Sequence, residues 1–143
     1  MSRLPIKFFS EETSFSPKAK TALRSWINET ILSEKHQLQE LNFIFCSDEY
    51  LLKINQQYLD HDTYTDIITF DHSEFKGEIY GDIFISIDRV KENAKTFQTT
   101  TLNELHRVII HGTLHLLGFT DKKNADKEKM TAKENQYLAI RNF

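Results

Sequence analysis

The segment TLNELHRVIIHGTLHLLG, residues 101–118, restricts the fold of this chain more than any other part of it. A helix over 102–117 carries apolar side chains on all its faces, so other elements must cover it on every side. The T-x-x-E spacing of Thr101 and Glu104 predicts a capping box at its start, and Gly118 predicts its end. We therefore expect a central buried helix, with the rest of the 143 residues arranged around it.

The remaining elements follow from apolar periodicity and turn residues. Strands are predicted over 4–9, 41–47, 65–72 and 78–87, and further helices over 17–31, 48–59, 89–97 and 124–140. Asp48 and Asp88 are the expected N-caps of two of these helices. The order β-α-β-α-β-β-α-α-α predicts the α+β class, with a small mixed β-sheet of about four strands packed on helices around the central one. The length fits one domain, residues 1–143.

Composition and charge exclude several classes of protein. Residues 1–14 lack the apolar core of a signal peptide, and no apolar run reaches the roughly 18 to 20 residues of a membrane span, so a cytoplasmic protein without a membrane partner is expected. The single cysteine, Cys46, excludes an internal disulfide and a cysteine-rich zinc site. A net charge of −3 argues against DNA binding, and any RNA contact must come from a local patch.

The stretch HGTLHLLGFTD, residues 111–121, has the spacing of a metal site. His111 and His115 are four residues apart, so their imidazoles project from one face of the helix, one turn apart. A turn at Gly118 would bring Asp121 under the pair as a third ligand, which is the open, catalytic arrangement of zinc. Alternatively, the histidines are hydrogen-bonded core residues, or Asp121 caps the last helix and water, Asp126 or Glu128 fills the third position.

Gly112 argues against one large class of zinc enzymes. Metallopeptidases with this histidine spacing have a glutamate directly after the first histidine, as general base for the zinc-bound water. Here Gly112 takes that place, so a peptidase would lack its catalytic group. The glycine would either let a substrate approach the metal closely or serve the packing of the helix.

The sequence resembles the YbeY family of bacterial rRNA-maturation endoribonucleases. HGTLHLLGFTD resembles the family pattern HGxLHLxGYDH. The segment INQQYLDHDTYTDIITF, residues 54–70, resembles a second family block, and further matches lie in GDIFIS and in the lead-in to the histidine helix. The matching positions are Asn55, Tyr58, Asp62, Thr65, Asp66, Phe70, Gly81, Asp82, Glu104, Leu105 and Arg107.

The resemblance implies a zincin-like fold and a single-strand-specific, metal-dependent endoribonuclease. It implies one Zn²⁺ per chain, at His111, His115 and Asp121, and action in 16S rRNA maturation and ribosome quality control. The implied partners are rRNA and the ribosomal subunit or ribosome-associated proteins. The expected chemistry is activation of water, or polarisation of the scissile phosphate, by the metal.

Two positions depart from the family pattern. Asp121 stands where the family has a third histidine, and a carboxylate ligand should weaken the Lewis acidity of the metal. Leu59 stands where the family has an arginine, so that role is vacant or moved. Arg107, on the same helical face as His111, is the candidate catalytic phosphate contact, unless it pairs with a carboxylate such as Glu104 or Asp66.

Three smaller questions stay open from the sequence. Asp66 and Asp82 occupy strand positions that disfavour aspartate, so each either orients a metal-bound histidine or hydrogen-bonds a turn. The metal could also be structural, in a ribosome assembly factor without chemistry. A metal-dependent hydrolase of another substrate, with phosphate esters preferred to peptides, is the remaining alternative.

Overall fold

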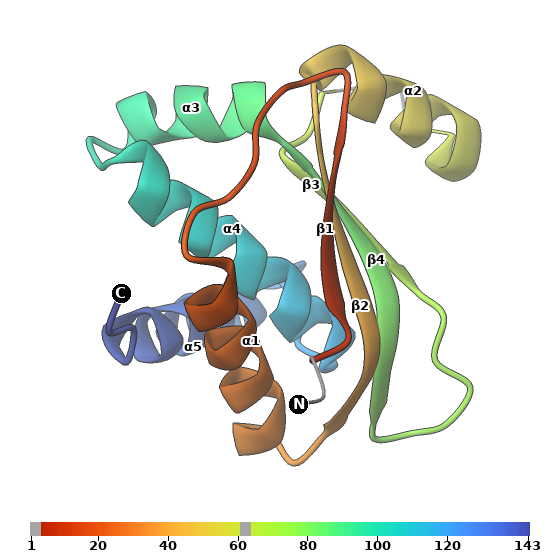
Figure 1. The fold of residues 1–143 in the computed structure, drawn as a ribbon, viewed down its shortest axis with the longest axis vertical. Helices are drawn as coiled ribbons and strands as arrows, with labels where there is room; N and C mark the ends of the chain where they lie inside the picture. Colours follow the sequence, from red (N-terminus) through yellow and green to blue (C-terminus); the bar gives the residue numbers. More distant parts are fainter. Residues whose placement is uncertain (1–3, 61–63) are drawn as a thin grey trace.

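The computed structural model describes residues 4–60 and 64–143, and Figure 1 shows a four-stranded sheet with helices on both faces. In chain order the elements are β1 (Ile6–Glu11), α1 (Lys20–Ser33), β2 (Gln37–Cys46), α2 (Asp48–Leu59), β3 (Ile67–Asp71), β4 (Glu78–Ser86), α3 (Ile87–Thr96), α4 (Thr101–Leu116) and α5 (Asn124–Ala139). None of the helices in the described part of the chain has the length and hydropathy needed to cross a bilayer.

The sheet has the strand order β1-β2-β4-β3, and it is mixed, as predicted. β1 and β4 run parallel to β2, whereas β3 runs antiparallel to β4 and forms a hairpin with it. In register, Phe8 lies beside Phe43, Phe43 beside Ile83, and Ile83 beside Thr69. The predicted class, a small mixed sheet of four strands packed on helices, is confirmed.

The two faces of the sheet are covered unequally. The main core joins the sheet to α1, α4 and α5, and Figure 1 shows these helices on one side of the strands. On the other face a small cluster of Cys46, Leu51 and Ile68 lies under α2. Burial, with the nearby Asp48 carboxylate, raises the pKa of the Cys46 thiol to about 12, so this thiol is an inert core group.

Helix α4 occupies the centre of the molecule, as its all-round apolar sequence predicts. It packs on β3 and β4 and also contacts α1, α3 and α5. Most of its side chains from 104 to 114 are buried, but those of Arg107, His111 and His115 are partly exposed. Because these three are four residues apart, they form one stripe along the helix, and this stripe opens to solvent.

The N-caps of three helices each lie one or two residues before the predicted ones. At α4 the N-cap is Thr100 and not Thr101, and at α2 and α3 the N-caps are serines and not Asp48 and Asp88. Ser47, Ser86 and Thr100 are the N-caps, each accepting a hydrogen bond from the backbone three residues on. Asp48 instead accepts from the Ser86 hydroxyl and pairs with Arg89 at 2.7 Å. Asp88 accepts a hydrogen bond from the backbone N–H of Asp48. Both aspartates therefore join the starts of α2 and α3, which local spacing does not reveal.

Strand β2 begins at Gln37, four residues before the predicted start at 41, while β1 runs from 6 to 11 instead of 4 to 9. The early part of β2 pairs with β4 alone, since the β1 partner of Leu41 is Ile6, the first residue of β1. Polar residues are tolerated there because the strand edge is open. The polar sequence of 37–40 therefore concealed a strand.

His106 is a buried neutral histidine, and its burial makes stability depend on pH. It is 3% exposed and packs against Trp26 and Phe143, and its Nδ1 accepts a hydrogen bond from Arg141 at 2.8 Å. Burial, with the Arg141 charge, lowers the pKa of His106 from 6.5 to about 4. The unfolded chain therefore takes up a proton below pH 6.5 that the folded protein excludes, so stability falls as the pH drops toward 4.

We expect His106→Asn to remove this pH dependence, because the asparagine oxygen can still accept from Arg141. The free energy of unfolding of the wild-type protein minus that of the variant should fall by about 2 to 3 kcal/mol between pH 7 and pH 4.5. Urea unfolding of both proteins at several pH values measures the difference. Parallel stability curves for the two proteins would show that His106 does not titrate in this way.

Candidate metal centre

Two imidazoles from the exposed stripe of α4 converge on one point. The Nε2 atoms of His111 and His115 lie 2.9 Å apart, and both side chains are about three-quarters buried. The spacing of four residues along the helix produces this approach, as predicted. The histidines are therefore not separate core residues, because their ring nitrogens face each other at the surface end of the helix.

The turn after α4 brings Asp121 to the same point. Gly118 has a φ of 103°, and the N–H groups of Gly118 and Phe119 donate to the carbonyls of His115 and Leu114, which closes the helix in a Schellman motif. An Oδ2 atom of Asp121 then lies 3.2 Å from Nε2 of His111 and 3.5 Å from that of His115. The predicted return of the chain at Gly118 is present.

Asp121 does not cap the last helix. The N-cap of α5 is Lys123, which makes no side-chain cap. Within residues 4–60 and 64–143, the group of ligand atoms close enough to hold one metal ion consists of His111, His115 and Asp121. Asp126 and Glu128, the alternative third ligands, are not members of this group.

The Nδ1 atom of each histidine, which points away from the metal site, lies within hydrogen-bond distance of an acceptor. Nδ1 of His115 lies 3.0 Å from the Phe119 carbonyl, which can only accept, so this nitrogen carries the proton. Nδ1 of His111 lies 2.6 Å from a carboxylate oxygen of Glu134. Both neutral rings then present unprotonated Nε2 atoms to each other and to Asp121. Three electron-rich atoms at such short range repel unless a proton or a metal ion lies between them, so the residues fit a metal ion.

Glu134 is the residue of this site that the sequence analysis missed. It is buried on α5, and its second oxygen pairs with Arg107 at 2.8 Å, so it joins Arg107 to His111. One signal in the sequence could have found it. Met130, Glu134 and Tyr137 share one face of α5, and a glutamate between two core residues needs a buried partner.

The two histidines have opposite pKa shifts. Burial opposes protonation of His111, but the hydrogen bond and charge of Glu134, with Asp121 and Asp66, outweigh it and raise the pKa. Burial and the neighbouring His111 lower the pKa of His115. The pair therefore favours one positive charge between the rings, which a metal ion can supply in place of a proton.

Gly112 serves the packing of α4. A Cβ atom at this position would lie 2.7 Å from Cδ1 of Ile67 and 3.0 Å from Cγ2 of Ile83. The glycine thus faces the sheet and lets the buried helix lie close to β3 and β4. Of the two expectations for this position, the structure supports helix packing.

The comparisons with known proteins decide the family. The sequence model described as Endoribonuclease YbeY matches residues 6–142. The chain belongs to the YbeY endoribonuclease family. It is 55% identical to Endoribonuclease YbeY of Cytophaga hutchinsonii, with 96% of each chain covered. It is 49% identical to Endoribonuclease YbeY of Flavobacterium psychrophilum, over 92% of this chain and 94% of that one.

A solved structure supports the fold of this YbeY family member. The solution structure of TM1509 from Thermotoga maritima matches with a TM-score of 0.65 and 29% sequence identity, over 93% of this chain and 86% of that one. The expected family is therefore confirmed for nearly the whole chain. Asp62, one of the positions on which the resemblance to YbeY was based, lies outside the described residues.

Arg107, Asp66 and Asp82 take partners that the family motifs do not specify. Asp66 lies just before β3 and not inside the strand predicted from 65, whereas Asp82 lies in β4. Arg107 donates to Glu134 and to Asn135, both at 2.8 Å, and so pairs with neither Glu104 nor Asp66. Asp82 accepts from Asn42 and pairs with His72 at 3.0 Å, which leaves it a contact within the sheet. Burial raises the pKa of Asp66, whose charge acts on His111 without a direct hydrogen bond.

Leu59, the second departure from the expected family pattern, lies beside the candidate metal centre. It ends α2 and is 42% exposed, and it lines a pocket of about 380 Å³ that includes His115. The other walls come from β3 and the residues before it: Asn55, Tyr64, Thr65, Ile67, Ile68 and Thr69. The wall of this YbeY site at position 59 is therefore apolar.

Proposed function

We propose that this chain is a zinc-dependent, single-strand-specific endoribonuclease that acts in 16S rRNA maturation in the cytoplasm. The observation that carries the proposal is the convergence of the His111 and His115 Nε2 atoms with Asp121 in a member of an endoribonuclease family. Two imidazoles and one carboxylate are a donor set that zinc favours. Its partners would be rRNA and ribosome-associated proteins.

The arrangement favours a catalytic metal over a structural one. A structural zinc is enclosed by four protein ligands, whereas a catalytic one retains a position for water or substrate. Three candidate ligands come together in the described residues, and the Asp121 side chain is 38% exposed. A zinc ion bound there would supply Lewis acidity toward a phosphate oxygen or a water molecule.

The chain's own residues orient the donors and direct the substrate. The Phe119 carbonyl fixes the ring of His115, and Glu134 fixes that of His111, so both Nε2 atoms keep their lone pairs toward the site. The half-exposed ring of Tyr64 stands in the wall of the adjacent pocket. An aromatic face can stack on a base only where that base is unpaired, which supports a preference for single strands.

Arg107 is proposed as the phosphate contact that Leu59 cannot provide. Its side chain is 36% exposed, and it lies one turn before His111 on the stripe that opens to solvent. For Arg107→Gln we expect the slope of RNA affinity against salt concentration, on logarithmic axes, to fall by about one, with the metal content unchanged. An unchanged salt slope would show that Arg107 serves Glu134 and Asn135 alone.

Asp121→His tests the departure at the third ligand. Histidine can bind zinc at about the same distance as aspartate, so the variant should retain one metal ion per chain. Asp121→Ala should lose affinity for the metal, because one of three donors is missing. Competition with a coloured chelator measures both. Equal metal affinity of Asp121→Ala and the wild-type protein would remove Asp121 from the ligand set.

An assay of three substrate classes tests the reaction itself. Single-stranded RNA, a simple phosphodiester and a peptide are offered to the same metal-loaded preparation. We expect cleavage of RNA, and no hydrolysis of the peptide, because Gly112 stands where a peptidase has its general base. Hydrolysis of the simple phosphodiester without cleavage of RNA would favour a different hydrolase.

A further inference from the structure

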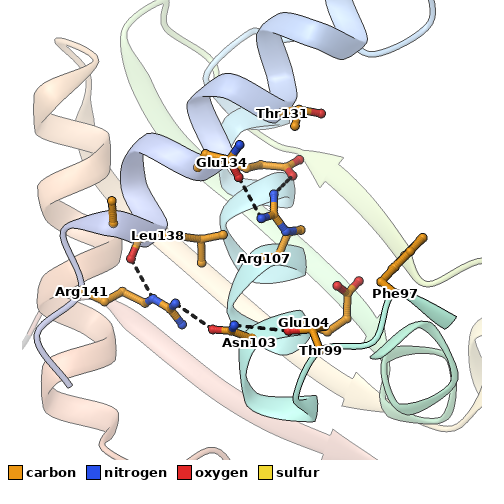
Figure 2. Close-up of a pocket in the computed structure, with 11 residues that line it drawn as sticks. Phe97, Thr99, Asn103, Glu104, Arg107, Thr131, Glu134, Leu138 and Arg141 are labelled. Atoms are coloured by element: carbon orange, nitrogen blue, oxygen red, sulfur yellow. Dashed lines mark hydrogen bonds and ion pairs between the residues drawn. The ribbon is translucent and has the colours of Figure 1, made fainter. Parts of the chain in front are cut away.

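A second pocket, of about 580 Å³, lies between α4 and α5 near the end of α3. Figure 2 shows its lining, in which Arg107 pairs with Glu134. Glu134 also bonds to His111 and so connects the pocket to the metal centre. Glu104 lies seven residues before His111 on α4, which is about 10 Å along the helix axis at 1.5 Å per residue. The pocket is thus close to the metal centre but separate from it.

Glu104 is a buried carboxylate without a hydrogen-bond donor. Glu104 is 5% exposed. Within residues 4–60 and 64–143, no side-chain or backbone donor forms a hydrogen bond to its carboxylate oxygens. Figure 2 shows this carboxylate between the labelled Arg107 and Phe97. Its oxygens are not among the fully buried polar atoms, so they face the pocket, where water is their donor unless a ligand replaces it. Burial and the nearby Asp66 raise the pKa of Glu104.

Two other groups of this pocket are also poised for a ligand. Arg141 bonds only to neutral acceptors in the described part of the chain, which are Asn103, the Leu138 carbonyl and Nδ1 of His106, so no carboxylate offsets its charge there. Phe97 ends α3 at the wall of the pocket, and its ring is 66% exposed. A cation suits a phosphate, and an exposed ring suits a base.

We propose that this pocket binds a guanine nucleotide unit of the RNA, with Glu104 as the residue that selects the base. The proposal rests on the proposed function, because it supplies that function with a base preference beside the cleavage site. Guanine presents two adjacent donors, N1–H and the 2-amino group, which one carboxylate can accept together. Adenine, cytosine and uracil lack this pair. Phe97 stacks on the base, and Arg141 contacts a phosphate.

Mononucleotide binding tests the proposal without depending on cleavage. Guanosine and inosine 5′-monophosphates differ only in the 2-amino group, and neither has an internucleotide bond for the protein to cut. NMR titration of the metal-loaded protein should show guanosine monophosphate binding about tenfold more tightly than inosine monophosphate. In Glu104→Gln this ratio should fall to within about twofold, since an amide cannot accept both donors. Glu128→Gln, which neutralises an exposed glutamate on α5, should keep the ratio.

Phe97→Ala provides a second variant at an exposed position. It should weaken both mononucleotides several-fold and leave their ratio unchanged, because stacking does not distinguish them. Equal affinity of the wild-type protein for the two nucleotides, or an unchanged ratio in Glu104→Gln, would overturn the proposal. Guanine-selective binding by a protein that cleaves no RNA would instead refute the proposed function and retain this site.

Discussion

Replacing His115 with alanine is expected to leave a folded protein that no longer holds a stoichiometric metal ion. One of the two converging Nε2 atoms is lost, and the remaining donors, His111 and Asp121, cannot hold zinc alone against water. RNA cleavage should fall by at least about a hundredfold, because even residues outside a ligand set change metal affinity or activity 10- to 100-fold. Elemental analysis and an RNA cleavage assay measure the two effects.

His72→Ala is the matched control for this variant. His72 is an exposed histidine that pairs with Asp82 on the sheet, so its removal should alter neither metal content nor cleavage. Metal content near one ion per chain in purified His115→Ala would contradict the assignment of His115. The comparison separates the loss of a ligand from the loss of a histidine in general.

Glu134→Ala is expected to have the second-largest effect, on metal affinity and on stability together. The variant removes the acceptor of His111 Nδ1–H and leaves Arg107 without its carboxylate. Metal affinity should fall about 10- to 100-fold, as for other partners of metal-binding histidines. The free energy of unfolding should fall by about 1 to 3 kcal/mol, because the hydrogen-bond partners lose their acceptor.

Glu134→Gln separates the orienting role from a purely structural one. Its amide oxygen can still accept from His111, so metal affinity should lie between those of the wild-type protein and Glu134→Ala. Chelator competition and urea unfolding are measured on all three proteins. If Glu134→Ala loses stability yet binds the metal as tightly as the wild-type protein, Glu134 only joins α5 to α4.

The part of the site that was predictable depends on local geometry. His111 and His115 are one helical turn apart, and Gly118 ends the same helix, so Asp121, three residues after Gly118, returns to the pair. Distances of this kind follow from helix geometry and one turn. The central position of α4 was predictable for a similar reason, because apolar side chains on all its faces require cover.

The part that was missed depends on contacts between distant segments. Glu134 reaches His111 only because α5 packs against α4, and no spacing within either helix states that contact. The caps at Ser47 and Ser86 were missed because Asp48, at the start of α2, bonds to Ser86 at the end of β4 and to Arg89 of α3. For Arg107 the sequence offered a phosphate contact or a pairing with Glu104 or Asp66, but the carboxylate that pairs with it is Glu134 of α5.

Metal removal and restoration in the wild-type protein tests the central claim most directly. The protein is freed of metal by chelation, verified by elemental analysis, assayed on single-stranded RNA, and assayed again after addition of one equivalent of zinc per chain. The account predicts that cleavage disappears with the metal and returns with zinc. Cleavage at the full rate by the verified metal-free protein would contradict it.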